Sequence, residues 1–294
     1  MKVEIFRRTV KDRKRGNSWE LLYHFAEGIK AAGDEAVIVN EDRSGPTVKG
    51  EMTPTAPMAA MFGYGGDQQM HHTKGRRREL ADNCRAKKIP LITFDGGLLS
   101  SFGNVSTSPD HHFRVSLYTP MNDGDFLSDN SPSDRWEMLV KKFDVKHEPW
   151  RKSNQDDPII FVMQRPHPNN VSNILERENE LPDDVEIQYT QKNFVGDEKK
   201  YYRFHFQEAI SNAHAVVTHN STASVDSCIR GIPTFCTSDL ALCWDVCNKD
   251  LNNIETPDTP DRTQWVNDLG YKLWSINEIK DGTVYKRFKS KLGL

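Results

Sequence analysis

The chain has 294 residues, of which 36% are hydrophobic and 28% charged, and its formal net charge is −3 at pH 7. This length accommodates two domains of about 150 residues each, and the composition is typical of a soluble globular protein. No apolar run approaches the ~20 residues of a membrane helix, and no signal peptide is evident. We therefore expect a cytoplasmic protein without a membrane span.

In the first half of the chain, short apolar segments alternate with helix-like segments. Strands are predicted at residues 3–6, 36–39, 59–64 and 90–94, and helices at 19–32 and near 77–88. Gly33 is expected to end the first helix. Such alternation predicts a parallel α/β sheet.

Residues 97–154 are rich in Ser, Asp, Asn and Pro, which indicates cleft-lining loops and an interdomain linker with a short helix at 133–143. The alternation then restarts. Strands are predicted at 158–163, 185–189, 215–218 and 234–236, and helices at 171–180, 201–213 and 222–230. Apolar residues at helical spacing predict a helical tail at 262–293.

The predicted fold class is therefore α/β, with two Rossmann-like parallel-sheet domains that face a cleft. We expect an N-terminal domain at 1–150 and a C-terminal domain at 151–294 that includes the helical tail. Ligands of open α/β sheets bind at the carboxyl ends of the strands, so polar clusters directly after strands are the candidate sites.

The most informative cluster follows the predicted strand at 215–218. Its residues are His219, Asn220, Ser221 and Thr222, and a predicted helix begins directly after them. The first N–H groups of a helix have no internal partner, and the helix dipole favours negative charge there. The sequence therefore predicts a phosphate site to which Ser221 and Thr222 add hydroxyl donors; the alternative is an ordinary capped helix.

Two further clusters follow predicted strands. Asp95 precedes two glycines, which fits either a general base in a cleft or a common Asp-Gly turn. Arg165 and His167 lie in the motif R-P-H-P, where both can donate to phosphate oxygens and His167 can stabilise a departing phosphate. The alternative for the second cluster is a proline-rich connection with an incidental histidine.

Lys and Arg outnumber Asp and Glu within the first 90 residues. Two basic runs contribute to this excess: Arg13, Lys14 and Arg15, and then Arg76, Arg77 and Arg78. A charge run is usually a solvated surface, and the alternative here is a rim that binds phosphate groups.

Several other classes of site lack their sequence patterns. No G-x-x-x-x-G-K-[ST] or G-x-S-x-G is present, which argues against a P-loop nucleotidase and an α/β-hydrolase. Cys243 and Cys247 have C-x-x-x-C spacing without a second Cys or His pair at suitable spacing, so no zinc site is expected. The five cysteines are expected to be reduced thiols.

Taken together, the three clusters after strands resemble motifs of GT-B glycosyltransferases, in the same order and domain placement. They look most like the branch of bacterial sialyltransferases and capsule Kdo transferases, and residues 133–151 and 262–269 resemble phage and capsule-type transferases. The resemblance implies that Asp95 is the base and that His167, Arg165 and the cluster at 219–222 contact the donor phosphate. Asp226 would then touch the ribose or the sugar, or be a surface acid.

This resemblance implies inverting transfer from a UDP- or CMP-linked nucleotide sugar, without a required metal. The first domain would bind an anionic acceptor, for which we favour double-stranded DNA carrying hydroxymethylated pyrimidines, with the base flipped out. Such an enzyme of phage origin would work in the host cytoplasm. The alternatives are a transferase for a surface or capsule glycan with a Kdo- or sialic-acid-like donor, a non-catalytic nucleotide-sugar-binding protein, and an epimerase.

Overall fold

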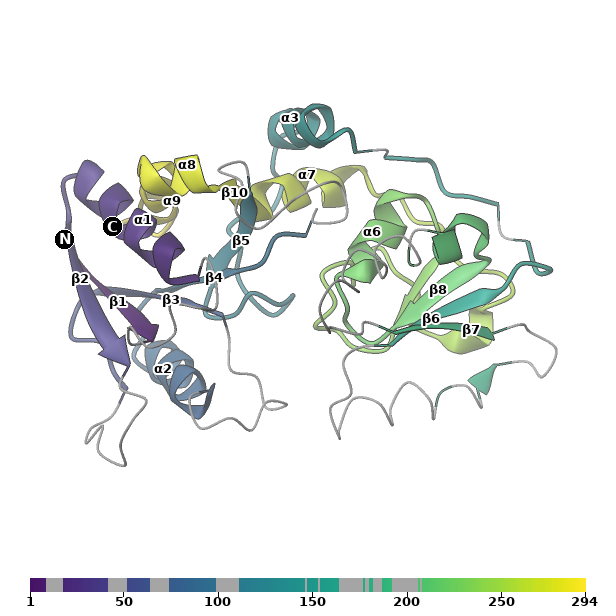
Figure 1. Ribbon diagram of the computed structural model, residues 1–294, viewed down its shortest axis with the longest axis horizontal. Helices are drawn as coiled ribbons and strands as arrows, with labels where there is room; N and C mark the ends of the chain where they lie inside the picture. Colours follow the sequence, from purple (N-terminus) through teal and green to yellow (C-terminus); the bar gives the residue numbers. More distant parts are fainter. Residues whose placement is uncertain are drawn as a thin grey trace. The chain divides into compact units, whose positions relative to one another are not determined.

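The computed structural model contains two compact units (Figure 1). It describes residues 1–8, 18–41, 52–63, 74–98, 111–145, 147–152, 154–163, 177, 180–181, 187–191, 206 and 208–294. Unit 1 consists of Met1–Pro120, Gly124–Asp129 and Tyr271–Leu294, and unit 2 consists of Met121–Asp123 and Asn130–Gly270. The C-terminal segment thus belongs to unit 1, whereas the sequence-based division at residue 150 placed it with the second domain.

Unit 1 is built on a six-stranded sheet with the strand order β10-β5-β4-β3-β1-β2. Its parallel strands are β1 (Lys2–Arg8), β2 (Glu35–Glu41), β3 (Met58–Phe62) and β4 (Leu91–Asp95). Two further strands pair in antiparallel fashion along one edge, β5 (His112–Leu117) with β4 and β10 (Leu273–Ser275) with β5.

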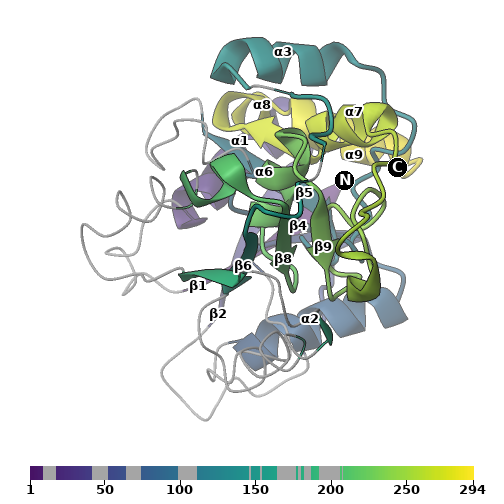
Figure 2. The ribbon, with the colours of Figure 1, turned by 90° about the vertical axis from the view of Figure 1, so that its right-hand side faces the viewer.

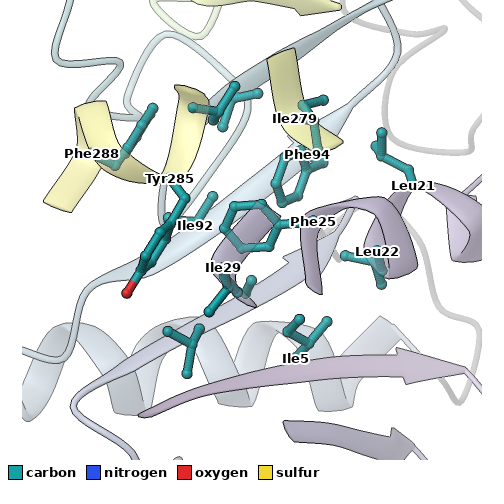
Figure 3. Close-up of a cluster of buried hydrophobic side chains, with 14 of the residues drawn as sticks. Ile5, Leu21, Leu22, Phe25, Ile29, Ile92, Phe94, Ile279, Tyr285 and Phe288 are labelled. Carbon is teal, nitrogen blue, oxygen red and sulfur yellow. The ribbon is translucent and has the colours of Figure 1, made fainter. Parts of the chain in front are cut away.

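Helices cover both faces of this sheet. The helices α1 (Ser18–Ala31), α8 (Ile276–Lys280) and α9 (Thr283–Lys291) lie on one face, and α2 (Lys74–Ala86) lies on the other (Figure 1). Figure 3 shows Phe25 of α1 among side chains from the sheet and from α9. Its ring meets that of Phe94 edge to face at 4.9 Å. Burial of each large apolar side chain contributes about 1.5–3 kcal/mol.

Asp34 joins the amino end of β2 to the C-terminal helix. Its carboxylate accepts hydrogen bonds from the amino group of Met1, from Tyr285 Oη at 2.7 Å and from Lys289 Nζ at 2.5 Å. These bonds, that of Lys289 above all, hold the pKa of Asp34 well below its usual value. The carboxylate therefore fastens the C-terminal segment to unit 1.

Unit 2 contains a four-stranded parallel sheet with the order β7-β6-β8-β9. Its strands are β6 (Ile159–Met163), β7 (Ile187–Gln191), β8 (Ala215–Thr218) and β9 (Thr234–Cys236), and in Figure 2 β8 lies between β6 and β9. Its other elements are α3 (Asp134–Phe143), α6 (Ala223–Ile229), α7 (Thr263–Lys272) and the 3-10 helices η4 (Ile210–Asn212) and η5 (Leu251–Asn253); the last residues of α7 belong to unit 1.

The parallel strands of the two units follow the same order. Numbered along the chain within each unit, they are arranged second, first, third and fourth: β2-β1-β3-β4 in unit 1 and β7-β6-β8-β9 in unit 2. The direction of winding reverses between the first and the third strand. Ligands of open α/β sheets bind outside the carboxyl ends of strands at such a switch point. The topology therefore selects the β1/β3 edge and the β6/β8 edge as candidate sites.

The predicted α/β class with parallel sheets is confirmed, and each predicted strand is present with its ends displaced by two residues or fewer. The predicted helices at 19–32, 77–88, 133–143 and 222–230 correspond to α1, α2, α3 and α6. Most of the predicted helix at 171–180 and the start of that at 201–213 lie outside the described residues. The arrangement of the two sheets around a cleft stays a prediction.

Two predictions about secondary structure are wrong. The segment read as irregular contains β5, in which His112, Arg114 and Ser116 alternate with apolar residues and are themselves buried. Their polar atoms have partners in the fold; Ser116 Oγ, for example, lies 2.9 Å from Thr93 Oγ1. The C-terminal tail is not continuously helical, because Leu273–Ser275 forms β10 and Ser275 then caps α8.

Candidate functional site

At the β6/β8 switch point of unit 2, the described strand ends lie directly before two of the predicted clusters in the sequence. Val162 pairs with Thr218 in the parallel register, and Thr218 Oγ1 donates to the carbonyl of Val162 at 3.2 Å. The two strands therefore leave the sheet side by side, β8 into the cluster at 219–222 and β6 into the R-P-H-P motif. Arg165 and His167 lie outside the described residues, so their placement stays a prediction.

His219, Asn220, Ser221 and Thr222 are all half-buried at this edge. His219 Nδ1 lies 2.8 Å from Thr237 Oγ1, and the backbone N–H of Thr237 donates to the carbonyl of Thr218 at 3.1 Å. Thr237, the residue directly after β9, thus orients the imidazole from the neighbouring strand end. When its hydroxyl donates to Nδ1, Nε2 carries the ring proton and can donate to a ligand.

Burial lowers the pKa of His219, and the guanidinium of Arg177 lowers it further. Arg177 is half-buried and ion-paired with Glu180, with Nη2 and Oε2 3.0 Å apart. A neutral imidazole at pH 7 and a nearby guanidinium together suit an anionic ligand. Sequence reasoning missed Arg177 and Thr237. For Thr237 a signal existed, since it is a hydroxyl residue directly after a predicted strand.

The start of α6 differs from the prediction. The helix has 7 residues, and the N-cap residue Thr222 makes no side-chain capping bond. The N–H of Ala223 donates to Ser221 Oγ at 3.3 Å, and those of Ser224 and Val225 donate to the carbonyls of Ser221 and Thr222 at 3.0 and 3.2 Å. These N–H groups are engaged, so the expectation of unpartnered donors is wrong for them. Ligand binding at this edge would rest chiefly on side chains.

Asp226 lies one turn into α6 and is 7% exposed. The alternative that it is a surface acid is therefore wrong. It is also more buried than the half-buried cluster at 219–222 that precedes the helix. Its proposed contact with the donor stays a prediction.

In unit 1, Asp95 is the last residue of β4, and its side chain is 34% exposed. One carboxylate oxygen accepts from Arg114 Nη2 at 2.7 Å, and the other accepts from the N–H of Gly96 at 2.8 Å. Arg114, on β5, is buried and also donates to the carbonyls of Gly96 and Pro120. The guanidinium thus fixes a partly exposed carboxylate at the end of a strand.

The second glycine after Asp95 is required by packing. A Cβ at Gly97 would lie 2.1 Å from the carbonyl oxygen of His112, which rules out any other residue without a backbone shift. The D-G-G motif therefore lies tightly against the neighbouring β5. This close approach explains the glycine, and it leaves the Asp95 carboxylate partly exposed.

His111 is a second candidate at this edge, which sequence reasoning missed. It is 8% exposed, and its buried Nδ1 has no hydrogen-bond partner among the residues that the structure describes. Its ring packs edge to face on Phe113 with centroids 4.5 Å apart, and burial lowers the pKa of the imidazole. A neutral histidine with an unsatisfied nitrogen next to the segment after Asp95 can serve substrate binding.

The predicted acceptor-binding residues are only partly described. Arg13, Lys14 and Arg15 lie outside the described residues, as does the side chain of Arg76. Arg78 Nε lies 3.5 Å from Asp82 Oδ2 along α2, which is an exposed ion pair of small energetic weight. Of the predicted residues, Arg77 reaches the β1/β3 switch point, where its Nη1 lies 3.2 Å from a Cβ built on Gly63 after β3. Arg7, near the carboxyl end of β1, also lies at this switch point, but it is buried and its Nη1 donates to Tyr23 Oη at 2.5 Å.

Within the part of the chain that the structure describes, we find no helix that is both long and apolar enough to cross a membrane.

No protein-family model matches the chain, and a comparison with curated proteins finds no match. Among solved structures, two of KpsC from Thermosulfurimonas dismutans are similar to this chain. The β-Kdo 2,7-transferase has 11% identity and a TM-score of 0.48 over 98% of this chain and 100% of that one. The β-Kdo 2,4-transferase has 14% identity and a TM-score of 0.48 over 92% and 89%.

A UDP-GlcNAc 2-epimerase of Methanocaldococcus jannaschii, solved with UDP-GlcNAc and UDP, is more distantly similar. It has 12% identity and a TM-score of 0.30 over 84% of this chain and 87% of that one. These similarities carry no function over to the present chain.

Proposed function

We propose that the chain is a glycosyltransferase of the GT-B type that transfers a sugar from a nucleotide-sugar donor to an acceptor hydroxyl. The observation that carries this proposal is the chemistry of the β6/β8 switch point. There, an oriented histidine and two hydroxyl residues lie half-buried at the place where an open α/β sheet binds its ligand.

Unit 2 would hold the donor phosphate. His219 Nε2 and the hydroxyls of Ser221 and Thr222 would donate to its oxygens, and Arg177 would add positive charge. Negative charge grows on the phosphate as the bond to the sugar breaks, so these interactions strengthen in the transition state. Arg165 and His167, two and four residues after the end of β6 in the sequence, would join the same group. Asp226 would support this half of the site from within α6.

Unit 1 would supply the base. Asp95 takes the proton of the acceptor hydroxyl, the hydroxyl oxygen forms a bond to the anomeric carbon, and the bond from that carbon to the phosphate oxygen breaks. A single displacement of this kind inverts the anomeric configuration. Arg114 acts as a positioning residue because it fixes the carboxylate without filling its exposed side.

The acceptor would be anionic and would bind unit 1 near the β1/β3 switch point, where Arg7 and Arg77 lie. DNA that carries hydroxymethylated pyrimidines provides both the negative charge and the primary hydroxyl. An anionic surface or capsule glycan provides the same chemistry. The two acceptors share the requirement for positive charge on unit 1, and the assay below separates them.

The test is a transfer assay read by mass spectrometry. The purified chain is incubated with a panel of UDP- and CMP-linked sugars, including Kdo- and sialic-acid-like donors. Each donor is offered with hydroxymethylated duplex DNA, with an anionic oligosaccharide, or without an acceptor. The proposal predicts a sugar adduct on one acceptor and release of the nucleotide. An isomerised donor would indicate an epimerase, and an unconsumed but tightly bound donor would indicate a binding protein; either would contradict the proposal.

Salt dependence gives a second criterion for the DNA acceptor. Binding to duplex DNA through several phosphates weakens steeply between about 50 and 200 mM salt. A fluorescence-anisotropy titration of the labelled duplex measures this dependence. An affinity that does not change over that range of salt concentration would contradict DNA as the acceptor. The transferase proposal would then be tested by the assay with the anionic oligosaccharide.

A further inference from the structure

Three cysteine side chains converge inside unit 2 at the end of β9, next to Thr237, the residue that contacts His219. Cys236 is the last residue of β9, and Cys243 and Cys247 follow in the turns after it. Their sulfur atoms all lie within 4.8 Å of one another, and the Cys236 and Cys243 sulfurs are 3.5 Å apart. All three residues are buried. Sequence spacing alone had offered only the Cys243–Cys247 pair.

The separations of these sulfur atoms fit a shared metal ion. Zinc–thiolate bonds of about 2.3 Å in a tetrahedral arrangement place two sulfurs about 3.8 Å apart. The observed spacing brackets this value, so small side-chain adjustments would suffice. A lone buried cysteine behaves as a small apolar residue, but three that face one another form a soft donor set suited to a thiophilic cation.

The chain leaves β9 after Cys236 and returns to the side of this strand at Asn248. Asn248 returns beside the strand, because its N–H donates to the carbonyl of Thr234 at 2.7 Å and its carbonyl accepts from the N–H of Cys236 at 3.0 Å. The residues between them fold in short turns, such as the bond from the Val246 N–H to the Cys243 carbonyl at 2.9 Å. The cysteines therefore face the inside of a loop that a metal ion would close.

One cation lies near the cluster. Lys249 Nζ sits 4.9 Å from the centroid of the Trp244 ring, and the carbonyl of Trp244 accepts a hydrogen bond from Cys247 Sγ. Three thiolates around a divalent ion carry a net charge of −1, which the ammonium group would partly offset. Among the described residues, no His, Asp or Glu joins the group, so the three sulfur atoms are the ligands that the described part of the chain offers.

We propose that Cys236, Cys243 and Cys247 bind one Zn²⁺ ion as thiolates. Three zinc–sulfur bonds form, and the three S–H protons pass to solvent, so no oxidant or reductant is involved. The ion braces the loop whose first residue, Thr237, orients His219, and its role is structural rather than catalytic. The assignment does not depend on the proposed function.

The first test is the metal content of the full chain. The protein is produced without a polyhistidine tag in zinc-supplemented medium and purified under reducing conditions without a chelator. Elemental analysis and native mass spectrometry should find one Zn²⁺ per chain. Cys243→Ser should lose the ion, whereas Cys84→Ser and Cys228→Ser, which alter buried cysteines outside the cluster, should keep it.

A spectroscopic test on the wild-type chain does not depend on whether a cysteine variant folds. Cobalt replaces zinc in the wild-type chain, and a thiolate-to-cobalt charge-transfer band should appear in the near ultraviolet. Two results would overturn the proposal. One is a folded, reduced wild-type chain that binds neither zinc nor cobalt on titration. The other is an anaerobically purified chain whose mass shows a Cys236–Cys243 disulfide in place of the metal.

Discussion

The parallel strands of the two units have the same order, but different side chains follow the carboxyl ends of these strands. In unit 1 the β1/β3 switch point carries Arg7 and Arg77, and the next strand ends in Asp95, which is ion-paired with Arg114. In unit 2 the β6/β8 switch point leads into a histidine, an amide and two hydroxyls. The scaffold is the same, so the difference in chemistry comes from the few residues directly after each strand.

The edges also differ in how their polar groups are held. The carboxylate of Asp95 is fixed by a buried guanidinium and a backbone N–H, so unit 1 presents a positioned charge. Among the described residues, His219 of unit 2 is oriented through Nδ1, and burial, with the charge of Arg177, lowers the pKa of its imidazole and favours the neutral form at pH 7. We infer that unit 1 acts on the proton of the acceptor and unit 2 on the phosphate of the donor. The following variants separate these roles.

The largest effect is expected for Asp95→Asn. Loss of the base should lower kcat by about 10²–10⁴-fold, because the amide cannot accept the acceptor proton. Donor affinity, measured by isothermal titration calorimetry, should stay unchanged. Asp129→Asn removes an exposed acid elsewhere in unit 1 and should leave both quantities intact. Turnover close to normal in Asp95→Asn would refute the role of this residue.

Arg114→Lys should lower kcat by about 10- to 100-fold. Lysine keeps the charge but cannot donate at once to Asp95, Gly96 and Pro120, so the carboxylate loses its fixed position. Steady-state kinetics should show the loss in kcat with the donor KM unchanged, and circular dichroism should confirm the fold. A variant with normal kcat would mean that Arg114 serves stability alone.

Ser221→Ala and Thr222→Val should each weaken donor binding by about tenfold, since each removes a hydrogen bond to a charged phosphate. The matched control is Ser227→Ala in α6, whose hydroxyl bonds to the carbonyl of Ala223 and faces the protein interior. Calorimetric titration with UDP and CMP measures the change. If both variants bind the nucleotide as tightly as the control and the wild type do, the proposal that the donor phosphate binds at this edge is wrong.

The smallest effect concerns pH. The pKa of His219 lies below the usual 6.5, so the imidazole gains its proton only as the pH falls through this lowered value. Nucleotide affinity should then increase by a few fold between pH 7.5 and pH 5, because the imidazolium attracts phosphate. The dependence should be weaker in His219→Asn.

The same shift predicts the direction of the stability change. The unfolded chain binds the His219 proton more readily than the folded chain does, so this residue lowers the free energy of unfolding as the pH falls below about 6.5. Thermal denaturation of the wild type and of His219→Asn across this range measures the difference. A loss of stability at higher pH instead would contradict the assigned shift.

Much of the fold could be predicted because short apolar runs end in polar residues. Both β8 and β9 have the predicted ends, and β4 is displaced by one residue. The strand β5 was missed because its buried Arg114 is stabilised by Asp95, a partner that only the folded chain brings close. The return of Leu273–Ser275 to the sheet of unit 1 likewise depends on a distant strand.

Candidate site residues could be predicted where they directly follow a strand that the sequence itself indicates. The cluster at 219–222 lies at a strand end, as expected, and Asp95 ends β4. Arg177 and His111 were missed because each reaches its place through a separate element, whereas Thr237 carried the same signal as Ser221, a hydroxyl residue after a predicted strand, and was overlooked. Sequence analysis also missed Cys236 of the proposed zinc site. It is separated from Cys243 by six residues across the end of a strand, which is not a recognised spacing of metal ligands.

The most direct test of the central claim is hydrogen–deuterium exchange of the wild-type chain with and without saturating UDP or CMP. The account predicts slower exchange in peptides that cover residues 215–237 and unchanged exchange at 91–98. Protection that appears at 91–98 while 215–237 stays unchanged would contradict it, because the nucleotide would then bind the edge assigned to the acceptor.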